Sequence, residues 1–96
     1  YILPVMYYVY MIKNQWNDLY VGVTDNPERR LSEHNQKRGA GYTKRQCMFE
    51  IVFLEEYETL AECRKREIQI KKWRRDKKDV LVARCQSGLQ TKQKTE

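Results

Sequence analysis

Two short runs of alternating hydrophobic and polar residues lie near the start of the chain, and a polar stretch separates them. Residues 6–12 are rich in aromatic and β-branched side chains, and residues 18–24 alternate with a period of two. Both runs are therefore predicted to be β-strands. Because only residues 13–17 connect them, we expect the two strands to form an antiparallel hairpin.

The apolar residues of both strands fall on one face of the hairpin when paired residues have numbers that sum to 30. This register predicts Tyr10 opposite Tyr20 and Tyr8 opposite Gly22 on the other face. Two interpretations of the tyrosines are open at this point. They form either a stabilising cross-strand aromatic pair or the wall of a pocket in which Gly22 leaves space.

The middle of the chain predicts a helix, a loop and a third strand. Asn26 can cap the first free N–H groups of a helix, and Pro27 suits the first helical position, so we expect a helix to about residue 37. Residues 38–48 contain two glycines and three basic residues, and they predict a loop that either connects elements or contacts a substrate. Residues 49–54 are predicted to form the third strand.

The C-terminal half predicts two more helices. Thr59 and Glu62 fit a capping box, so a helix is expected to run from there to about Arg75. Asp76 is expected to cap a short final helix over residues 77–84. The predicted fold is thus α+β, with a three-stranded antiparallel sheet flanked by helices.

These elements are predicted to form one domain over residues 6–84. A chain of 96 residues with 41% hydrophobic residues has room for one small core. Residues 85–96 are polar and are expected to be disordered, and residues 1–5 are expected to be an extension before a natural start at Met6. No apolar run approaches the roughly 18 residues that span a membrane, so no membrane partner is expected.

The three cysteines, Cys47, Cys63 and Cys85, show no CxxC spacing, and the chain has a single histidine. We therefore expect neither a disulfide framework nor a structural zinc site. Free thiols are typical of a reducing compartment, so the sequence predicts a cytoplasmic protein.

Basic residues are concentrated in one segment. The formal net charge is +6, and residues 64–78 contain nine basic residues and two acidic ones. The rest of the chain is close to neutral, so this segment carries the excess. A run of charges is often only a solvated helix face. The degree of concentration here favours a surface that binds the phosphates of a nucleic acid.

Glu67 lies on the predicted inward stripe of this basic helix. A buried carboxylate is costly unless it has a partner, so we expect an inward-facing arginine or a metal cation beside it. Arg30 is the candidate partner. Leu31 is expected to anchor the first helix to the sheet, and the helical spacing then directs Arg30 and His34 towards the sheet as well.

Four motifs occur in an order that resembles the GIY-YIG nuclease superfamily. They are Tyr8-Val9-Tyr10, Tyr20-Val21-Gly22, Asn26-Pro27-Glu28-Arg29-Arg30 with His34 and Asn35, and the segment 66–73. The resemblance covers about residues 6–84 and is nearest to small stand-alone bacterial members. Two features depart from the family pattern. Tyr8 replaces the first glycine, and residues 76–96 contain no asparagine, although many nucleases of the superfamily carry one near the end of the module.

The resemblance implies a phosphodiesterase that acts on DNA and needs one divalent ion, Mg²⁺ or Mn²⁺. By motif, Tyr10 and Tyr20 are the implied active-site tyrosines, Arg30 is the catalytic arginine and Glu67 is the metal ligand. His34 matches a position that polar or aromatic site residues often occupy, and it is a candidate for proton relay.

Phosphodiester hydrolysis requires an activated water and neutralised phosphoryl oxygens. Tyr10 is the candidate to take a proton from water, which requires a pKa below the usual value of about 10. Tyr20 would orient water or phosphate, and Gly22 would be a structural residue of the site. Flanking phosphates would be bound by basic side chains that carry no base-reading pattern, namely Lys44, Arg45, Lys71, Lys72 and Arg75.

Three classes of function fit these features to different degrees. A metal-dependent DNA endonuclease, selective for branched or single-stranded DNA and linked to repair or recombination, accounts for the tyrosines, Arg30 and Glu67 together. A protein partner that targets it to DNA is compatible with this class. A nucleic-acid-binding module for DNA or RNA, with weak or no catalysis, explains the basic helix equally well. An interaction module that binds an acidic protein explains least.

Overall fold

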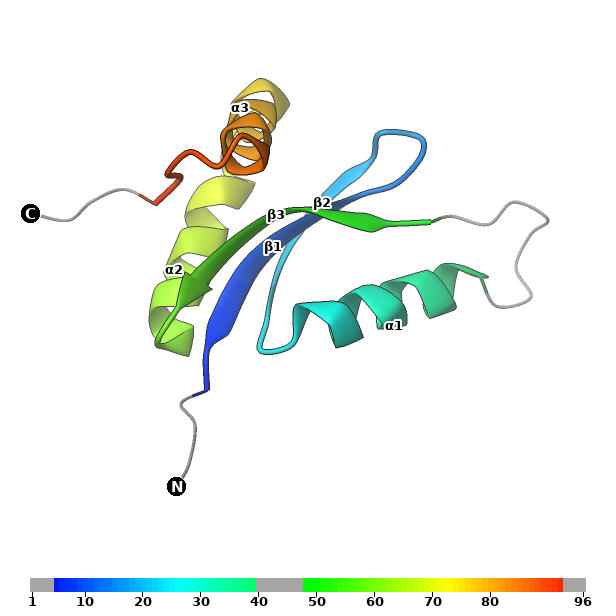
Figure 1. The fold of residues 1–96 in the computed structure, drawn as a ribbon, viewed down its shortest axis with the longest axis horizontal. Helices are drawn as coiled ribbons and strands as arrows, with labels where there is room; N and C mark the ends of the chain where they lie inside the picture. Colours follow the sequence, from blue (N-terminus) through cyan, green and yellow to red (C-terminus); the bar gives the residue numbers. More distant parts are fainter. Residues whose placement is uncertain (1–4, 40–47, 93–96) are drawn as a thin grey trace, which may run out of the picture.

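The computed structural model describes residues 5–39 and 48–92 of the chain. The elements follow in the order β1 (Tyr7–Lys13), β2 (Leu19–Thr24), α1 (Pro27–Gly39), β3 (Glu50–Tyr57), α2 (Leu60–Lys71) and α3 (Arg75–Gln86). The strands form one antiparallel sheet in the order β2-β1-β3. Figure 1 shows α1 on one side of this sheet and α2 and α3 on the other. The predicted fold class is confirmed.

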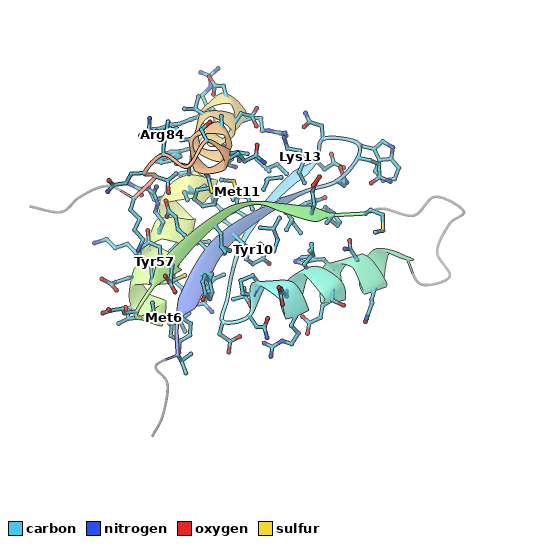
Figure 2. All side chains as sticks on the ribbon, in the orientation of Figure 1. Met6, Tyr10, Met11, Lys13, Tyr57 and Arg84 are labelled. Carbon is cyan, nitrogen blue, oxygen red and sulfur yellow. The ribbon has the colours of Figure 1, made fainter. Side chains whose placement is uncertain are left out.

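The central strand β1 supplies core residues to both faces of the sheet. Val9 and Met11 are fully buried among the residues that pack under α2 and α3. Tyr10 and Ile12 belong to a smaller cluster on the α1 side. Figure 2 shows this alternation for Tyr10 and Met11, as expected for successive residues of a strand. Burying side chains of this size contributes about 1.5–3 kcal/mol each to stability.

The hairpin register differs from the predicted one by two residues. Tyr10 lies opposite Gly22, Tyr20 lies opposite Ile12, and Tyr8 lies opposite Thr24. The expected pairs Tyr10–Tyr20 and Tyr8–Gly22 are therefore wrong. A shift of two residues keeps every side chain on its predicted face, so both tyrosines still project from the α1 side.

The turn between β1 and β2 explains the register. Asn14 Oδ1 accepts hydrogen bonds from the backbone N–H groups of Trp16 at 3.0 Å and Asp18 at 2.9 Å. Asn17 adopts a φ of 70°. The Asn14 N–H donates to the Asp18 carbonyl at 3.2 Å, so residues 15–17 form a three-residue loop within the five residues between the strands. A loop of this length that ends on a left-handed residue is a common hairpin form, and asparagine tolerates that backbone conformation well.

The caps predicted for the first two helices are present. Asn26 Oδ1 accepts from the Arg29 N–H at 3.1 Å at the start of α1. Thr59 Oγ1 accepts from the Glu62 N–H at 3.2 Å at the start of α2. Each bond satisfies a backbone donor that has no partner within its helix.

The boundary between the last two helices lies elsewhere than predicted. α2 ends at Lys71 rather than near Arg75, and α3 begins at Arg75 with Arg74 at the N-cap position. The expected cap by Asp76 is therefore wrong. Asp76 lies in the first turn of α3, where the helix dipole favours a negative charge.

The described structure continues past residue 84, where the predicted domain ends. α3 continues to Gln86. Arg84 then donates from Nε and Nη2 to the Gln90 carbonyl, at 3.2 and 2.9 Å. Side-chain donors on the helices thus contact the segment that follows residue 84, and the domain boundary itself stays a prediction. Residues 93–96 and 1–4 lie outside the described residues.

The described cysteines and helices bear on two further expectations. Cys63 and Cys85 are free thiols, and Cys47 lies outside the described residues. Burial, and then the negative charge of Glu67, raise the pKa of the Cys63 thiol to about 11, so it stays protonated at neutral pH.

Within residues 5–39 and 48–92, no helix has the length and apolar character needed to cross a membrane.

Candidate functional site

The side of the sheet that faces α1 brings three predicted site residues into contact. Arg30 Nε donates a hydrogen bond of 3.4 Å to Tyr10 Oη, and this hydroxyl lies 3.1 Å from His34 Nε2. Arg30 and His34 are one helical turn apart, so both reach the same point on β1. Tyr10 is 4% exposed, whereas the Arg30 side chain is 39% exposed. We call these three residues the tyrosine–arginine cluster; its phenol is buried and its guanidinium is open to solvent.

Gly22 makes room for the Tyr10 ring on β2. A Cβ atom at position 22 would lie 2.5 Å from Tyr10 Oη and 2.6 Å from its Cζ. Such distances are far inside van der Waals contact, so any side chain at this position would displace the ring. Gly22 thus lies next to a candidate site tyrosine. The tyrosine opposite it is Tyr10, whereas the predicted register put Tyr8 there.

Tyr20 reaches the cluster through Phe49, a residue that sequence reasoning missed. The Tyr20 ring packs edge-on against Phe49 with centroids 5.4 Å apart, and the Phe49 ring lies 6.0 Å from that of His34. Asn35 fixes Phe49 because its Oδ1 accepts from the Phe49 N–H at 2.8 Å and its Nδ2 donates to the Phe49 carbonyl at 3.3 Å. The available signal was that Asn35 lies one turn after Leu31, on the side of the helix that faces the sheet.

The expected ion pair between Arg30 and Glu67 is wrong. Arg30 Nη1 instead pairs with Glu33 Oε1 at 3.1 Å, within α1. The hydrogen bonds with Tyr10 and Glu33 raise the pKa of the Arg30 guanidinium above its usual value. Arg30 therefore keeps its positive charge at every working pH, as binding of a phosphate requires.

Glu67 lies on α2, the helix that packs on the far side of the sheet from the cluster. Its side chain is 13% exposed, which agrees with the predicted inward stripe, and its Oε2 is 3.0 Å from Lys71 Nζ. α2 packs against β1 and against β2, which is an edge strand. Among the described residues, the contacts of Glu67 do not join it to the tyrosine–arginine cluster.

The donor atoms near Glu67 limit how a divalent ion could be held. Within residues 5–39 and 48–92, no group of three or more His, Cys, Asp or Glu side chains is placed to bind a metal ion. A hard cation such as Mg²⁺ is commonly bound by one or two carboxylates together with water and substrate phosphates. The single carboxylate of Glu67 therefore fits such an ion only when a substrate and water supply the other ligands.

A buried ion pair on the far side of the sheet is the largest polar feature that sequence reasoning missed. Arg66 Nε and Nη2 donate to the two carboxylate oxygens of Glu55 at 2.9 and 3.1 Å. The side chains are 7% and 2% exposed. Tyr57 Oη also donates to Glu55 Oε1 at 2.8 Å, and Arg66 Nη2 donates to the Thr91 carbonyl at 3.0 Å. We call this arrangement the Glu55–Arg66 network.

The network favours the ionised form of Glu55. Burial opposes the ionisation of Glu55, but hydrogen bonds from Arg66, Thr91 and Tyr57 outweigh that effect, so the pKa of Glu55 is lowered. The Arg66 guanidinium also lies 5.3 Å from the centre of the Trp73 ring, and Lys77 Nζ lies 4.2 Å from it. These contacts fix the orientation of α2, and with it the residue that follows Arg66, which is Glu67.

The predicted phosphate-binding residues that the structure describes lie where α2 meets α3. Lys71, Lys72 and Arg75 are all exposed. Lys71 pairs with Glu67, and Arg75 Nε pairs with Asp79 Oδ1 at 2.9 Å. Lys44 and Arg45 lie outside the described residues.

Known proteins are similar to this chain in both sequence and fold. A UPF0213 protein of Staphylococcus saprophyticus is 36% identical over 77 residues, which cover 80% of this chain and 94% of the relative. A UPF0213 protein of Natronomonas pharaonis is 39% identical over 77 residues, with 80% and 91% covered. The solution NMR structure of a protein from E. faecalis is similar with a TM-score of 0.62 and 31% identity over 95% of both chains.

A second solved structure, that of a UPF0213 protein from Bacillus halodurans, is similar with a TM-score of 0.54 and 29% identity, covering 81% of this chain and 83% of the other. The family model of the GIY-YIG catalytic domain matches residues 6–79, which include all four motifs. This chain therefore belongs to the GIY-YIG catalytic domain family.

Proposed function

We propose that this protein is a divalent-metal-dependent endonuclease that hydrolyses phosphodiester bonds of DNA, with the scissile phosphate bound at the tyrosine–arginine cluster. The family is of the nuclease type, which implies a nucleic acid substrate. The observation that carries the proposal is the contact of Arg30 Nε with Tyr10 Oη beside His34 Nε2. In this contact the permanent positive charge of Arg30, which solvent can reach, lies beside two groups that can exchange a proton.

The proposed roles follow from which atoms are accessible. Arg30 is exposed enough to offer N–H groups to a phosphate, and its charge offsets the negative charge that develops on the phosphoryl oxygens. The hydrogen bond between Tyr10 Oη and His34 Nε2 provides a path along which a proton taken from water can pass. Tyr20, which is 41% exposed, is available to orient the water or the phosphate.

GIY-YIG nucleases generally use divalent metal ions. We propose Glu67 as the ligand and Mg²⁺ or Mn²⁺ as the ion, because Glu67 is the inward-facing acid of the last family motif. When bound, such an ion would supply charge stabilisation to phosphoryl oxygens of a substrate that passes the β2 edge of the sheet, because Glu67 and the tyrosine–arginine cluster lie on opposite sides of it. We propose that Lys72, Lys44 and Arg45 bind flanking phosphates. The structure describes Lys72, whereas Lys44 and Arg45 lie outside the described residues.

The family resemblance suggests the kind of DNA and the pathway, and the free thiols suggest the compartment. We place the enzyme in the cytoplasm, where it would act on branched or single-stranded DNA during repair or recombination, with a protein partner that directs it to its target.

The position of Glu67 favours one alternative function. Its contact with Lys71, across the sheet from the tyrosine–arginine cluster, is compatible with a nucleic-acid-binding module that has weak or no catalysis. Such a module would bind DNA or RNA through the same basic residues. The two functions differ in whether metal-dependent products appear.

A cleavage panel tests the proposal. Branched, flapped, single-stranded and duplex DNA are incubated with Mg²⁺, Mn²⁺ or a chelator. Products should depend on metal, and Arg30→Ala, Tyr10→Phe and Glu67→Ala should each lower the rate by about 10²–10³-fold. Arg29→Ala is the matched control, because Arg29 lies beside Arg30 on α1 but pairs with Asp25 at the surface. Binding without products under every metal condition would instead establish the binding module.

A further inference from the structure

A hollow of about 430 Å³ opens next to the tyrosine–arginine cluster, between the start of α1 and the sheet. Tyr8, Ile51 and Leu54 form its sheet side, and Pro27 lines it from α1. Tyr8 and Tyr10 are two residues apart on β1, so both project from the same face. Leu54, which is 39% exposed, lies on β3 opposite Tyr10. The hollow and the cluster therefore share one surface.

The lining of the hollow suits a flat ring with N–H donors. Tyr8 offers an aromatic ring, and Ile51 and Leu54 offer apolar contacts, as in sites where unpaired bases stack on side chains. Asp25 and Glu28 add carboxylate oxygens at the edge. Carboxylates repel a phosphate and accept hydrogen bonds from an exocyclic amino group. The apolar and aromatic lining, with the carboxylate of Glu28 at its edge, thus favours a base over a phosphate.

One of the two acceptors at the edge, Asp25, has a surface partner. Asp25 Oδ1 pairs with Arg29 Nη2 at 3.0 Å, and the backbone N–H of Arg29 is in turn held by Asn26 Oδ1. The distance along β1 between Tyr8 and Tyr10 is about 7 Å for two residues of a strand. This is a separation that one nucleotide can span when its phosphate lies at Arg30 and its base has left the stack.

We propose that this hollow receives one unstacked base, of the kind that bears an exocyclic amino group, from the strand whose phosphate lies at the tyrosine–arginine cluster. This inference rests on the proposed function and adds a substrate class to it. A base held in duplex stacking cannot enter the hollow, so the site selects single strands, flaps and other unpaired junctions. Paired DNA would have to lose stacking energy before it could bind.

Binding is measured in the presence of chelator, so that affinity is determined without cleavage. Single-stranded oligonucleotides carry one abasic position, which is moved along the strand, and their dissociation constants are compared with that of the intact strand. We expect one position at which loss of the base weakens binding about tenfold. In Tyr8→Leu this position effect should vanish, and in Tyr8→Phe, which keeps the ring, it should remain.

Glu28→Gln provides a second variant that changes only an exposed residue. It should reduce the preference for adenine or cytosine over thymine at the same position, with little effect on overall folding. The proposal is overturned if no abasic position matters, or if the position effect persists unchanged in Tyr8→Leu. Metal-dependent cleavage with no such position would leave the endonuclease proposal intact and remove the base site. A position effect without any cleavage would support the base site and contradict the endonuclease proposal.

Discussion

The two faces of the sheet differ in how completely helices close them off from water. Under α2 and α3, Val9, Met11 and Ile70 have no exposed surface. The ion pair of Glu55 and Arg66 on the same side is almost completely buried. Under α1, Tyr10 is buried, but Arg30 and Tyr20 keep about two fifths of their surface exposed. The first face supplies most of the apolar burial that stabilises the domain. The second leaves polar groups where a ligand can reach them.

The largest expected effect comes from breaking the closed face. Glu55→Gln removes the charge that compensates Arg66 in a buried site, and we expect it to lower the free energy of unfolding by about 3–5 kcal/mol. The double variant Glu55→Leu with Arg66→Met should recover most of this loss, because it leaves no unpaired charge. Urea unfolding of the three proteins measures both values. A cost below about 1 kcal/mol for the single variant would show that the pair is not a structural centre.

Acid should affect the same pair. The lowered pKa of Glu55 means that its contribution to stability is present above the unfolded value of 4.5 and is lost as pH falls through the folded value. The wild type should therefore lose stability below about pH 4.5 more steeply than Glu55→Gln does. Unfolding free energies measured over this range in both proteins check the sign.

Gly22→Ala tests the open face. The added Cβ would displace the Tyr10 ring, which we expect to cost about 1–3 kcal/mol of stability and to abolish activity at the tyrosine–arginine cluster. In a Tyr10→Ala background the same substitution should cost much less, because the ring it collides with is absent. A double-mutant cycle on thermal unfolding gives this coupling. Equal costs in both backgrounds would contradict the predicted collision.

Ending the chain after Gly88 removes the Gln90 and Thr91 carbonyls that accept from Arg84 and Arg66. Hydrogen bonds to charged groups contribute about 1.5–3 kcal/mol, so the loss should be of this size and should be felt on the closed face alone. Gln90→Ala, which keeps both carbonyls and changes only an exposed side chain, is the control. A shortened protein as stable as the control would show that the segment contributes no support.

The smallest effect is expected at the exposed corner between α2 and α3. Lys72→Ala should leave folding unchanged and weaken binding to DNA only a few-fold at low salt. If Lys72 contacts one phosphate, the slope of log affinity against log salt should fall by about 0.7–0.9. An unchanged slope would place the nucleic acid elsewhere on the surface.

The sequence predicted the elements well because caps and strand alternation are local signals. Asn26 and Thr59 mark helix starts through bonds to residues three positions away. The hairpin register was harder to predict, because registers that sum to 30 and 32 bury the same faces and differ only in the turn at Asn17. Tyr10, Arg30 and His34 were named from the sequence and are in contact in the structure, because strand parity and helical spacing place them on the same side of the sheet; their roles stay predictions.

Contacts between distant segments could not be derived in the same way. Glu55 lies on the same strand face as Phe53, and Arg66 lies one turn after Cys63, so each could have been recognised as inward-facing. Their pairing depends on where α2 lies across the sheet, and no pattern of neighbouring residues in the sequence predicts that position. For the same reason the sequence left the partner of Glu67 open between an arginine such as Arg30 and a cation, whereas Arg30 pairs with Glu33 on its own helix.

The two tryptophans lie in different surroundings and can serve as separate optical reporters. Trp73 lies close to the guanidinium of Arg66 and the ammonium of Lys77, whereas Trp16 sits in the hairpin turn and is 46% exposed. A positive charge near an indole shifts its emission, so fluorescence from a Trp16→Phe protein would follow the packing around Arg66 in real time. Release of α2 from the sheet would then be visible without any added label.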